Sequence, residues 1–285
     1  MAALPIEGER LVGDGGFMMR SGYNLRGTYM ITRCAAAVAL TIALEAASGA
    51  RADDAEAKRL VKAMSDYIAT QTAISFAFDT NLQIVTKERQ KLDLASSGTV
   101  TLNRPDKIRV TRHGGFADVE AVFDGKTLSL LGKNANVYGQ VDVPGSVDHL
   151  IDELRDKYDR PVPGADLLQS DLYDELMPPV VDVKDLGSGV IGGVECDHFA
   201  FRNKDVDWQI WIAQGARPYP CRYVITSKLV RDAPQYTVQI RDWKTGNEVA
   251  ADDFRFSSPA NAKKVTLKDL DTDELPKIFA VKGAK

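Results

Sequence analysis

Hydrophobic residues recur at helical spacing between residues 53 and 70. The positions that share this spacing are Leu60, Val61, Met64, Tyr67 and Ile68. Acidic side chains stand at the start of the segment, where the helix dipole favours negative charge. The pattern predicts an amphipathic helix that buries one face.

Strict alternation of hydrophobic and polar residues replaces helical spacing from residue 74 to residue 143. Asp124-Gly125 lies between two apolar runs and is a hairpin turn signal. Such alternation is typical of an antiparallel meander with one hydrophobic face. The alternating positions include Ile74, Phe76, Phe78, Leu82, Ile84, Leu92, Leu94, Val100, Leu102, Ile108, Val110, Val119, Ala121, Phe123, Leu128, Leu130, Val137, Val141 and Val143.

Helical spacing returns at residues 147–158, and a second short helix is expected at 165–176, ended by Pro178-Pro179. Strands are then expected at 180–183, 194–201, 206–212, 219–230 and 236–243, with a short last strand around Phe254 and Phe256 and a polar tail at 261–285. The order is one helix, a meander, two helices and a second meander. It predicts an α+β protein in which few helices cover one face of a large antiparallel sheet.

The N-terminal segment has the features of a secretory signal peptide. Arg33 is followed by an uncharged apolar run from Cys34 to Leu44, and Ala50-Arg51-Ala52 has the small-x-small pattern of a cleavage site. The run is shorter than the roughly 20 residues that cross a bilayer. We expect translation to start at Met30, with residues 1–29 as an N-terminal extension, and cleavage after Ala52. Residues 53–285 would then form a single soluble, secreted domain. The alternative is a buried N-terminal helix.

Composition excludes one class of partner and limits the residues available for a metal site. Hydrophobic residues make up 44% and charged residues 27%, as in soluble globular proteins, and the formal net charge is -4. General nucleic-acid binders have a basic excess, so we expect no nucleic-acid partner. The three cysteines and three histidines leave little material for a metal cluster. We therefore expect neither a metal nor a cofactor.

Catalytic and nucleotide-binding motifs are weak. Residues 187–192 match G-x-G-x-x-G, but a strand-like segment follows them where a dinucleotide site needs a helix, so we interpret the glycines as a turn between strands. Cys196 and His198 are two apart on a predicted strand and share a face. A hydrolase that uses His198 therefore stays open as a remote alternative to a non-catalytic protein.

Two cysteines, Cys196 and Cys221, follow the predicted cleavage site, and an even number in an oxidising compartment favours a disulfide. A simple meander places them on strands separated by the Trp208 strand, roughly 9 to 10 Å apart. This exceeds disulfide reach, which ends at about 7 Å. The pair can therefore form only at a frayed or bulged end, such as Pro218-Tyr219-Pro220 could make. The alternative is two separate buried thiols.

Three segments, in order, resemble the LolA/LppX-like family of periplasmic lipoprotein carriers. They are Gly98-Thr-Val-Thr-Leu-Asn-Arg104-Pro105-Asp-Lys-Ile-Arg109, Val122-Phe-Asp124-Gly125-Lys126-Thr127-Leu128 and Asp253-Phe254-Arg-Phe256-Ser-Ser-Pro259-Ala-Asn-Ala. The nearer resemblance is to a branch of predicted periplasmic proteins marked by Cys196-Asp-His198 and Trp208-Gln-Ile-Trp211.

The resemblance implies a curved, unclosed half-barrel whose concave face is covered by helices and encloses a hydrophobic cavity. It also implies that Arg104 closes a helical lid. The expected cavity lining is Ile74, Phe76, Phe78, Val100, Leu102, Val110, Trp208, Ile210, Tyr223 and Ile225, and the expected lid residues are Leu150, Ile151, Leu154 and Leu168.

The function that follows is a periplasmic binding or carrier protein for an acylated lipid or a lipoprotein, with no catalytic residues. An envelope protein of the inner or outer membrane is a further expected partner. The alternative on the same fold is an envelope-stress sensor or protein-interaction module.

Overall fold

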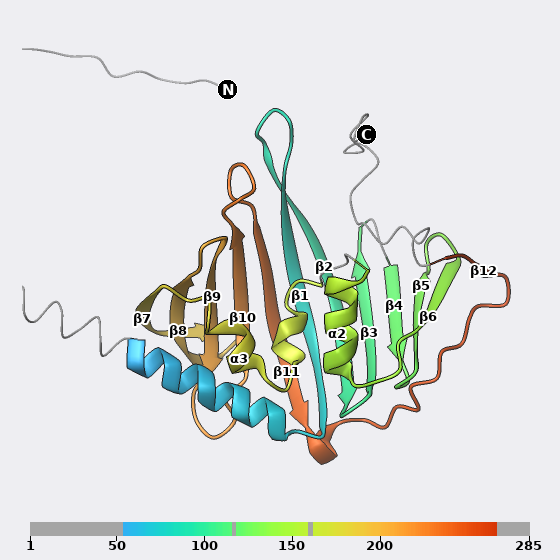
Figure 1. Ribbon diagram of the computed structural model, residues 1–285, viewed down its shortest axis with the longest axis horizontal. Coiled ribbons are helices and arrows are strands. Elements are labelled where there is room, and N and C mark those ends of the chain that lie inside the picture. The colour runs from blue at the N-terminus through green and yellow to red at the C-terminus, as the bar shows by residue number, and fades with distance from the viewer. Residues whose placement is uncertain (1–53, 116–117, 159–161, 267–285) are drawn as a thin grey trace, which may run out of the picture. The chain divides into compact units, whose positions relative to one another are not determined.

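The computed structural model describes residues 54–115, 118–158 and 162–266 of the chain, and most of them belong to one twelve-stranded sheet (Figure 1). The first six strands precede the central helices and the next five follow them. The strands are β1 (Ala73–Val85), β2 (Lys91–Asn103), β3 (Lys107–Gly114), β4 (Asp118–Phe123), β5 (Thr127–Gly132), β6 (Val137–Asp142), β7 (Asp182–Ile191), β8 (Val194–Arg202), β9 (Val206–Ala213), β10 (Pro220–Ser227), β11 (Gln235–Thr245) and β12 (Lys263–Lys264).

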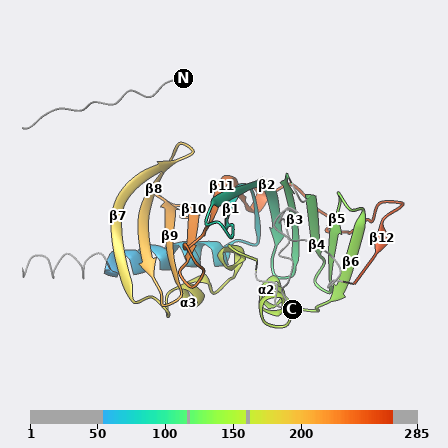
Figure 2. The same ribbon diagram turned by 90° about the horizontal axis from the view of Figure 1, so that it is seen from above.

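The sheet consists of two meanders joined side by side. Its strand order is β12-β6-β5-β4-β3-β2-β1-β11-β10-β9-β8-β7, so the first strand of one meander pairs with the last strand of the other. The β1–β11 pair is antiparallel, with Phe78 opposite Ile240. The sheet is open, with β7 and β12 at its two ends (Figure 2). This confirms the expected unclosed α+β sheet.

Four helical segments pack on one face of the sheet, in front of it in Figure 1. They are an N-terminal helix at residues 54–70, α2 (Val147–Asp156), the 3-10 helix η1 (Ala165–Leu168) and α3 (Leu172–Leu176). We call α2, η1 and α3 together the cover. The Ser146 hydroxyl caps α2 by accepting a hydrogen bond from the His149 backbone N–H at 3.1 Å. A further 3-10 turn, η2 (Gly246–Glu248), follows β11.

One hydrophobic cluster fills the space between this sheet face and the helices. On β1, Ile74, Phe76 and Phe78 are buried in it, as alternation predicts. Aromatic rings extend the contact between strands: Phe201 stacks on Trp208 with ring centroids 3.9 Å apart. The N-terminal helix contributes Ala57, Val61, Met64 and Ile68 to the same cluster. Burial of these side chains is the main force that holds the helices on the sheet.

Four local predictions were wrong. No strand forms at Phe254 or Phe256; the Phe254 N–H instead bonds to the Asp252 side chain, and its φ of 51° ends any extended run. The short strand β12 lies later, inside the segment expected to be a polar tail, and pairs with β6 in parallel. The segment 165–176 forms two short helices. Strand β7 runs through most of the glycine motif, and only Gly192-Gly193 make the turn.

The predicted signal peptide and N-terminal extension, residues 1–52, and most of the expected polar tail, residues 267–285, lie outside the described residues. The hairpin predicted at Asp124-Gly125 is present between β4 and β5. Gly125 has a φ of 94°, and the Asp124 carboxylate accepts the backbone N–H groups of Lys126 and Thr127 at 3.0 and 2.8 Å. The positive φ explains why glycine occupies this position.

Candidate binding site between the sheet and the cover

All ten residues expected to line a cavity lie in the cluster between the sheet and the helices. Eight of them are buried: Ile74, Phe76, Phe78, Val100, Leu102, Trp208, Ile210 and Tyr223. Val110 and Ile225 are partly buried and pack against the others. They come from β1, β2, β3, β9 and β10, so the structure brings together residues far apart in the sequence.

The expected lid residues face these strands from the cover. Leu150 on α2 and Leu168 on η1 are buried in the cluster, and Ile151 and Leu154 of α2 pack against it while partly exposed. A backbone N–H of α3, that of Tyr173, donates to the Ser65 hydroxyl of the N-terminal helix at 3.1 Å. The cover therefore contacts both the sheet and the N-terminal helix.

Arg104 fastens the cover to the sheet, at the end of the hairpin between β2 and β3. Its side chain is only 12% exposed. One terminal nitrogen donates to the backbone carbonyl of Leu168 at 2.7 Å, and the other lies 3.5 Å from the Asp148 carboxylate of α2. Asp148 in turn accepts the Ser170 hydroxyl and the Ser170 backbone N–H. One guanidinium thus joins α2, η1 and the segment after η1 to the sheet.

A second polar contact joins the cover to β10, and sequence reasoning missed it. The Tyr223 hydroxyl donates to the Asp166 carboxyl of η1 at 3.3 Å. Burial raises the pKa of Asp166, and burial together with the neighbouring Asp166 raises the pKa of Tyr223 well above its ordinary value. The second oxygen of Asp166, Oδ1, is buried without a hydrogen-bond partner among the described residues. Both shifts favour the protonated forms, in which an acid and a phenol pair without a buried charge.

The residues near Arg104 include further buried polar atoms. The Gln169 side chain is 1% exposed and donates to Asp152 at 3.1 Å, but its Oε1 has no partner within the described chain. Buried donors and acceptors without partners carry a free-energy cost. No sequence motif marks Gln169 or Asp166, because Asp166 lies in a short helix that periodicity resolves poorly and Gln169 directly follows that helix.

The structure brings Cys196 and Cys221 together, although they are unbonded thiols in it. The ladder between β9 and β10 shifts register between Pro220 and Arg222, at the position where the sequence suggested a distortion. Both cysteines are buried, in a small cluster with Ala213 separate from the main one. Contact with the Cys221 thiol lowers the pKa of Cys196, and the same contact with burial raises that of Cys221.

His198 is not arranged as a general base for Cys196. Its Nε2 lies 3.1 Å from the Gln209 amide oxygen, and its ring stacks on Trp211 at 3.8 Å. The Cys196 sulfur lies 3.4 Å from the Val194 carbonyl. Burial lowers the pKa of His198. Within the described residues, therefore, no Cys196–His198 hydrogen bond supports nucleophilic catalysis.

Among the described residues, no group of three or more His, Cys, Asp or Glu side chains is placed to hold a metal ion. No helix of this part of the chain has both the length and the apolar character needed to cross a membrane.

Residues 57–268 match a protein family, DUF2092, whose description is "Predicted periplasmic protein". No curated protein matches the chain. The fold is similar to those of several solved proteins at low identity. Lipoprotein LppX of Mycobacterium tuberculosis is 14% identical over 69% of this chain and 100% of that one, with a TM-score of 0.39. One chain of the MucA/MucB complex of Pseudomonas aeruginosa is 12% identical over 71% of this chain and 61% of that one, with a TM-score of 0.42. A LolA superfamily protein of Nitrosomonas europaea is 10% identical over 66% of this chain and 93% of that one, with a TM-score of 0.34.

Proposed function

Since the chain belongs to the DUF2092 family of predicted periplasmic proteins, we propose that it is a non-catalytic periplasmic carrier of a hydrophobic ligand. The ligand is an acylated lipid or a lipoprotein, and its acyl chains lie between the sheet and the cover. The single observation that carries the proposal is the attachment of three short helices to a large apolar sheet face by Arg104 and a few other polar contacts.

This attachment suits a cover that opens. The three helical segments have 10, 4 and 5 residues, too short to be stable alone. Their side chains supply apolar contacts, while Arg104 and the Asp166–Tyr223 pair fix their position. Breaking these few polar contacts loosens the cover without disturbing any strand ladder, and its apolar contacts with the sheet are then the ones that a ligand replaces. An acyl chain can then replace cover side chains against the same strands.

The energy of such a ligand requires an opening cover. Burial of an acyl chain yields about 0.8 kcal/mol per CH₂, so a 16-carbon chain gains on the order of 12 kcal/mol when fully buried. A ligand held this tightly dissociates slowly unless the protein opens or an acceptor binds the chain better. Arg104 is the residue that we expect to govern this step.

The test is native mass spectrometry of the mature protein purified from periplasm without detergent. We expect a lipid adduct, and we expect it to be reduced in Leu168→Ala. Leu131→Ala is the matched control, because Leu131 is also buried but lies outside the cluster under the cover. Repeated absence of any adduct in the wild-type protein, at full folded yield, would refute carriage.

A second candidate, a protein-interaction module of the envelope, is favoured by the exposed edge strand β7. Val181, Leu186 and Val190, in and beside this strand, are 73%, 50% and 65% exposed. An unpaired edge can accept a strand from a partner. Photo-crosslinking from position 186 in the periplasm should then yield a discrete adduct with an envelope protein, and position 204 on the β8–β9 turn should not. Identical crosslinking patterns at the two positions would contradict this function.

A further inference from the structure

The sheet face turned away from the helices carries a continuous row of side chains across six adjacent strands. Ladder pairing places His198 of β8 beside Trp211, Trp211 beside Arg222, Arg222 beside Gln239, Gln239 beside Asp79, and Asp79 beside Ser97 of β2. On these strands the neighbours in sequence, such as Phe78 and Ile210, point into the main cluster. By alternation the row lies on the opposite face, here called the outer face.

Arg222 is held in place within this row by Trp211. The guanidinium carbon lies over the indole at 5.4 Å, while the His198 ring from the strand on the other side stacks on the same indole at 3.8 Å. The Nε atom of Arg222 is sealed from solvent and has no partner among the described residues. Stacking on an aromatic ring fixes a guanidinium and leaves its terminal nitrogens free to donate.

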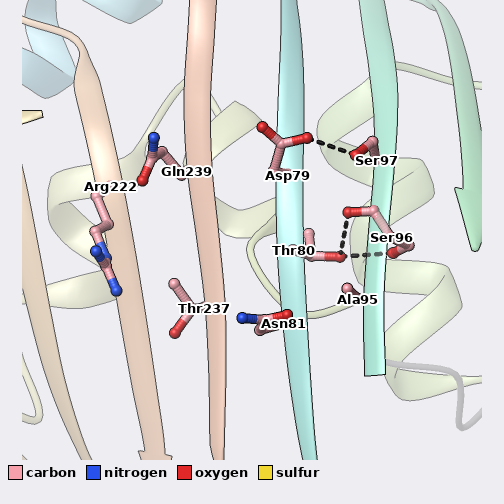
Figure 3. Close-up of a pocket in the computed structure, with 9 residues that line it drawn as sticks. All are labelled: Asp79, Thr80, Asn81, Ala95, Ser96, Ser97, Arg222, Thr237 and Gln239. Carbon is pink, nitrogen blue, oxygen red and sulfur yellow. Dashed lines mark hydrogen bonds between the residues drawn. The ribbon is translucent and has the colours of Figure 1, made fainter. Parts of the chain in front are cut away.

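A depression of about 300 Å³ lies directly beside Arg222. It is lined by Asp79, Thr80, Asn81, Ala95, Ser96, Ser97, Arg222, Thr237 and Gln239. Figure 3 shows the Arg222 guanidinium reaching along its strand to the level of Thr237, with Asn81 across the depression. The groups that face a ligand here are the Arg222 guanidinium, the Gln239 and Asn81 amides and the Thr237 hydroxyl. The Thr80 and Ser96 hydroxyls are buried and bond to each other at 2.6 Å. The depression therefore suits a polar ligand.

The depression carries an unbalanced positive charge, that of Arg222. Asp79 is engaged by Arg241 at 3.0 Å and by the Ser97 hydroxyl at 2.5 Å, and these contacts lower its pKa. No ion pair within the described residues involves Arg222, whereas Arg202 at the end of β8 is paired with Asp207 at 3.2 Å. Burial is the largest cause of the lowered pKa of His198, and the positive charge of Arg222 lowers that pKa further. An anion is the ligand that would complete this arrangement.

We propose that the depression on the outer face binds a hydroxyl-bearing phosphate monoester or diester, with Arg222 as its charge partner. Arg222 donates from its terminal nitrogens to two phosphate oxygens, the geometry that a planar guanidinium fits best. Gln239, Asn81 and Thr237 bond the hydroxyls. The site is separate from the space under the cover, so its test does not depend on acyl-chain carriage.

Tryptophan fluorescence can report binding, because Trp211 contacts Arg222 while Trp208 and Trp243 are buried. The probes are glycerol 3-phosphate, glycerate as the carboxylate of matched length, and glycerol as the neutral control. We expect saturable binding of glycerol 3-phosphate, with weaker binding of glycerate and none of glycerol. Arg222→Gln should weaken binding by about tenfold or more, since a charge-assisted pair is lost.

Arg202→Gln is the matched control, because it removes the same charge from an arginine outside the depression. It should bind glycerol 3-phosphate as the wild type does. Thr237→Val tests the depression without changing charge, and we expect a smaller loss. Equal binding by the two arginine variants, or no saturable binding by folded wild-type protein, would overturn the proposal.

Binding to vesicles distinguishes a lipid headgroup from a soluble phosphate ester as the ligand of this depression. Vesicles of phosphatidylglycerol present the same glycerophosphate group at a membrane surface, and phosphatidylcholine vesicles are the control. Arg222-dependent sedimentation with phosphatidylglycerol vesicles supports recognition of a lipid headgroup. Binding of glycerol 3-phosphate without such sedimentation supports a soluble phosphate ester.

Discussion

Replacing Arg104 with alanine tests whether one guanidinium holds the cover on the sheet. The charge-assisted hydrogen bond to the Leu168 carbonyl spans 2.7 Å in a site where Arg104 is 12% exposed. Its loss should cost about 1.5–3 kcal/mol. The Asp148 pair is longer, at 3.5 Å, and its carboxylate is 27% exposed. We therefore add about 1 kcal/mol or less for it.

The expected loss is thus about 1.5–4 kcal/mol, a large share of the roughly 5–15 kcal/mol by which domains are stable. Urea unfolding followed by tryptophan fluorescence measures it. Arg104→Lys should recover part of the loss, because a lysine keeps the charge but not the two-pronged geometry. Lys58→Ala, which removes an exposed helix ion pair, should change little.

Hydrogen exchange separates loosening of the cover from global unfolding. In Arg104→Ala, the amides of α2 and η1 should exchange much faster than in the wild type, while those of β1 and β2 keep their relative protection. A variant as stable as Lys58→Ala, with unchanged exchange in the cover, would show that Arg104 does not fasten it.

The remaining predictions concern single positions. Burial raises the folded pKa of Asp166 above its unfolded value. The contribution of Asp166 to the free energy of unfolding is therefore fully present at low pH and is lost as pH rises through the folded pKa. Asp166→Asn should therefore raise the melting temperature near neutral pH and not at about pH 4; parallel curves would contradict this. We expect Cys196 and Cys221 to be disulfide-bonded in periplasmic protein, resisting alkylation in denaturant until reductant is added; immediate alkylation would refute the bond. Gly125→Ala should destabilise by about 1–3 kcal/mol in urea titrations, because its φ is 94° and a Cβ would lie 2.7 Å from Asp106; a neutral effect would contradict the turn geometry.

The faces of the strands could be predicted from the sequence because burial follows a period of two. Phe76, Leu102 and Trp208 each stand among polar or small neighbours, and each is buried in the structure. The hairpin at Asp124-Gly125 was equally accessible, since a positive φ demands glycine. The order of the helices and strands, and the α+β class of the fold, follow from these local rules.

Features set by long-range contacts were not predictable in the same way. Asp166 meets Tyr223 only because η1 docks on β10, and no local pattern in either segment anticipates a buried acid. Phe254 alternates with Phe256 as in a strand, yet a side-chain contact from Asp252 turns the backbone. The register shift near Cys221 was suggested by two prolines, but the contact between the sulfurs required the three-dimensional ladder.

The seam between β1 and β11 has a consequence for how the chain folds after export. The central ladder of the sheet pairs the first strand of the described chain, β1, with the next-to-last, β11. During export the N-terminal meander reaches the periplasm with one edge of β1 unpaired, and that edge stays open until almost the whole domain has followed. Closing such a distant pair is slow, because loop-closure entropy is lost before any contact forms. An open β-edge beside exposed Phe76 and Phe78 is prone to aggregate. The newly exported chain is therefore the stage at which we expect this protein to depend most on periplasmic chaperones.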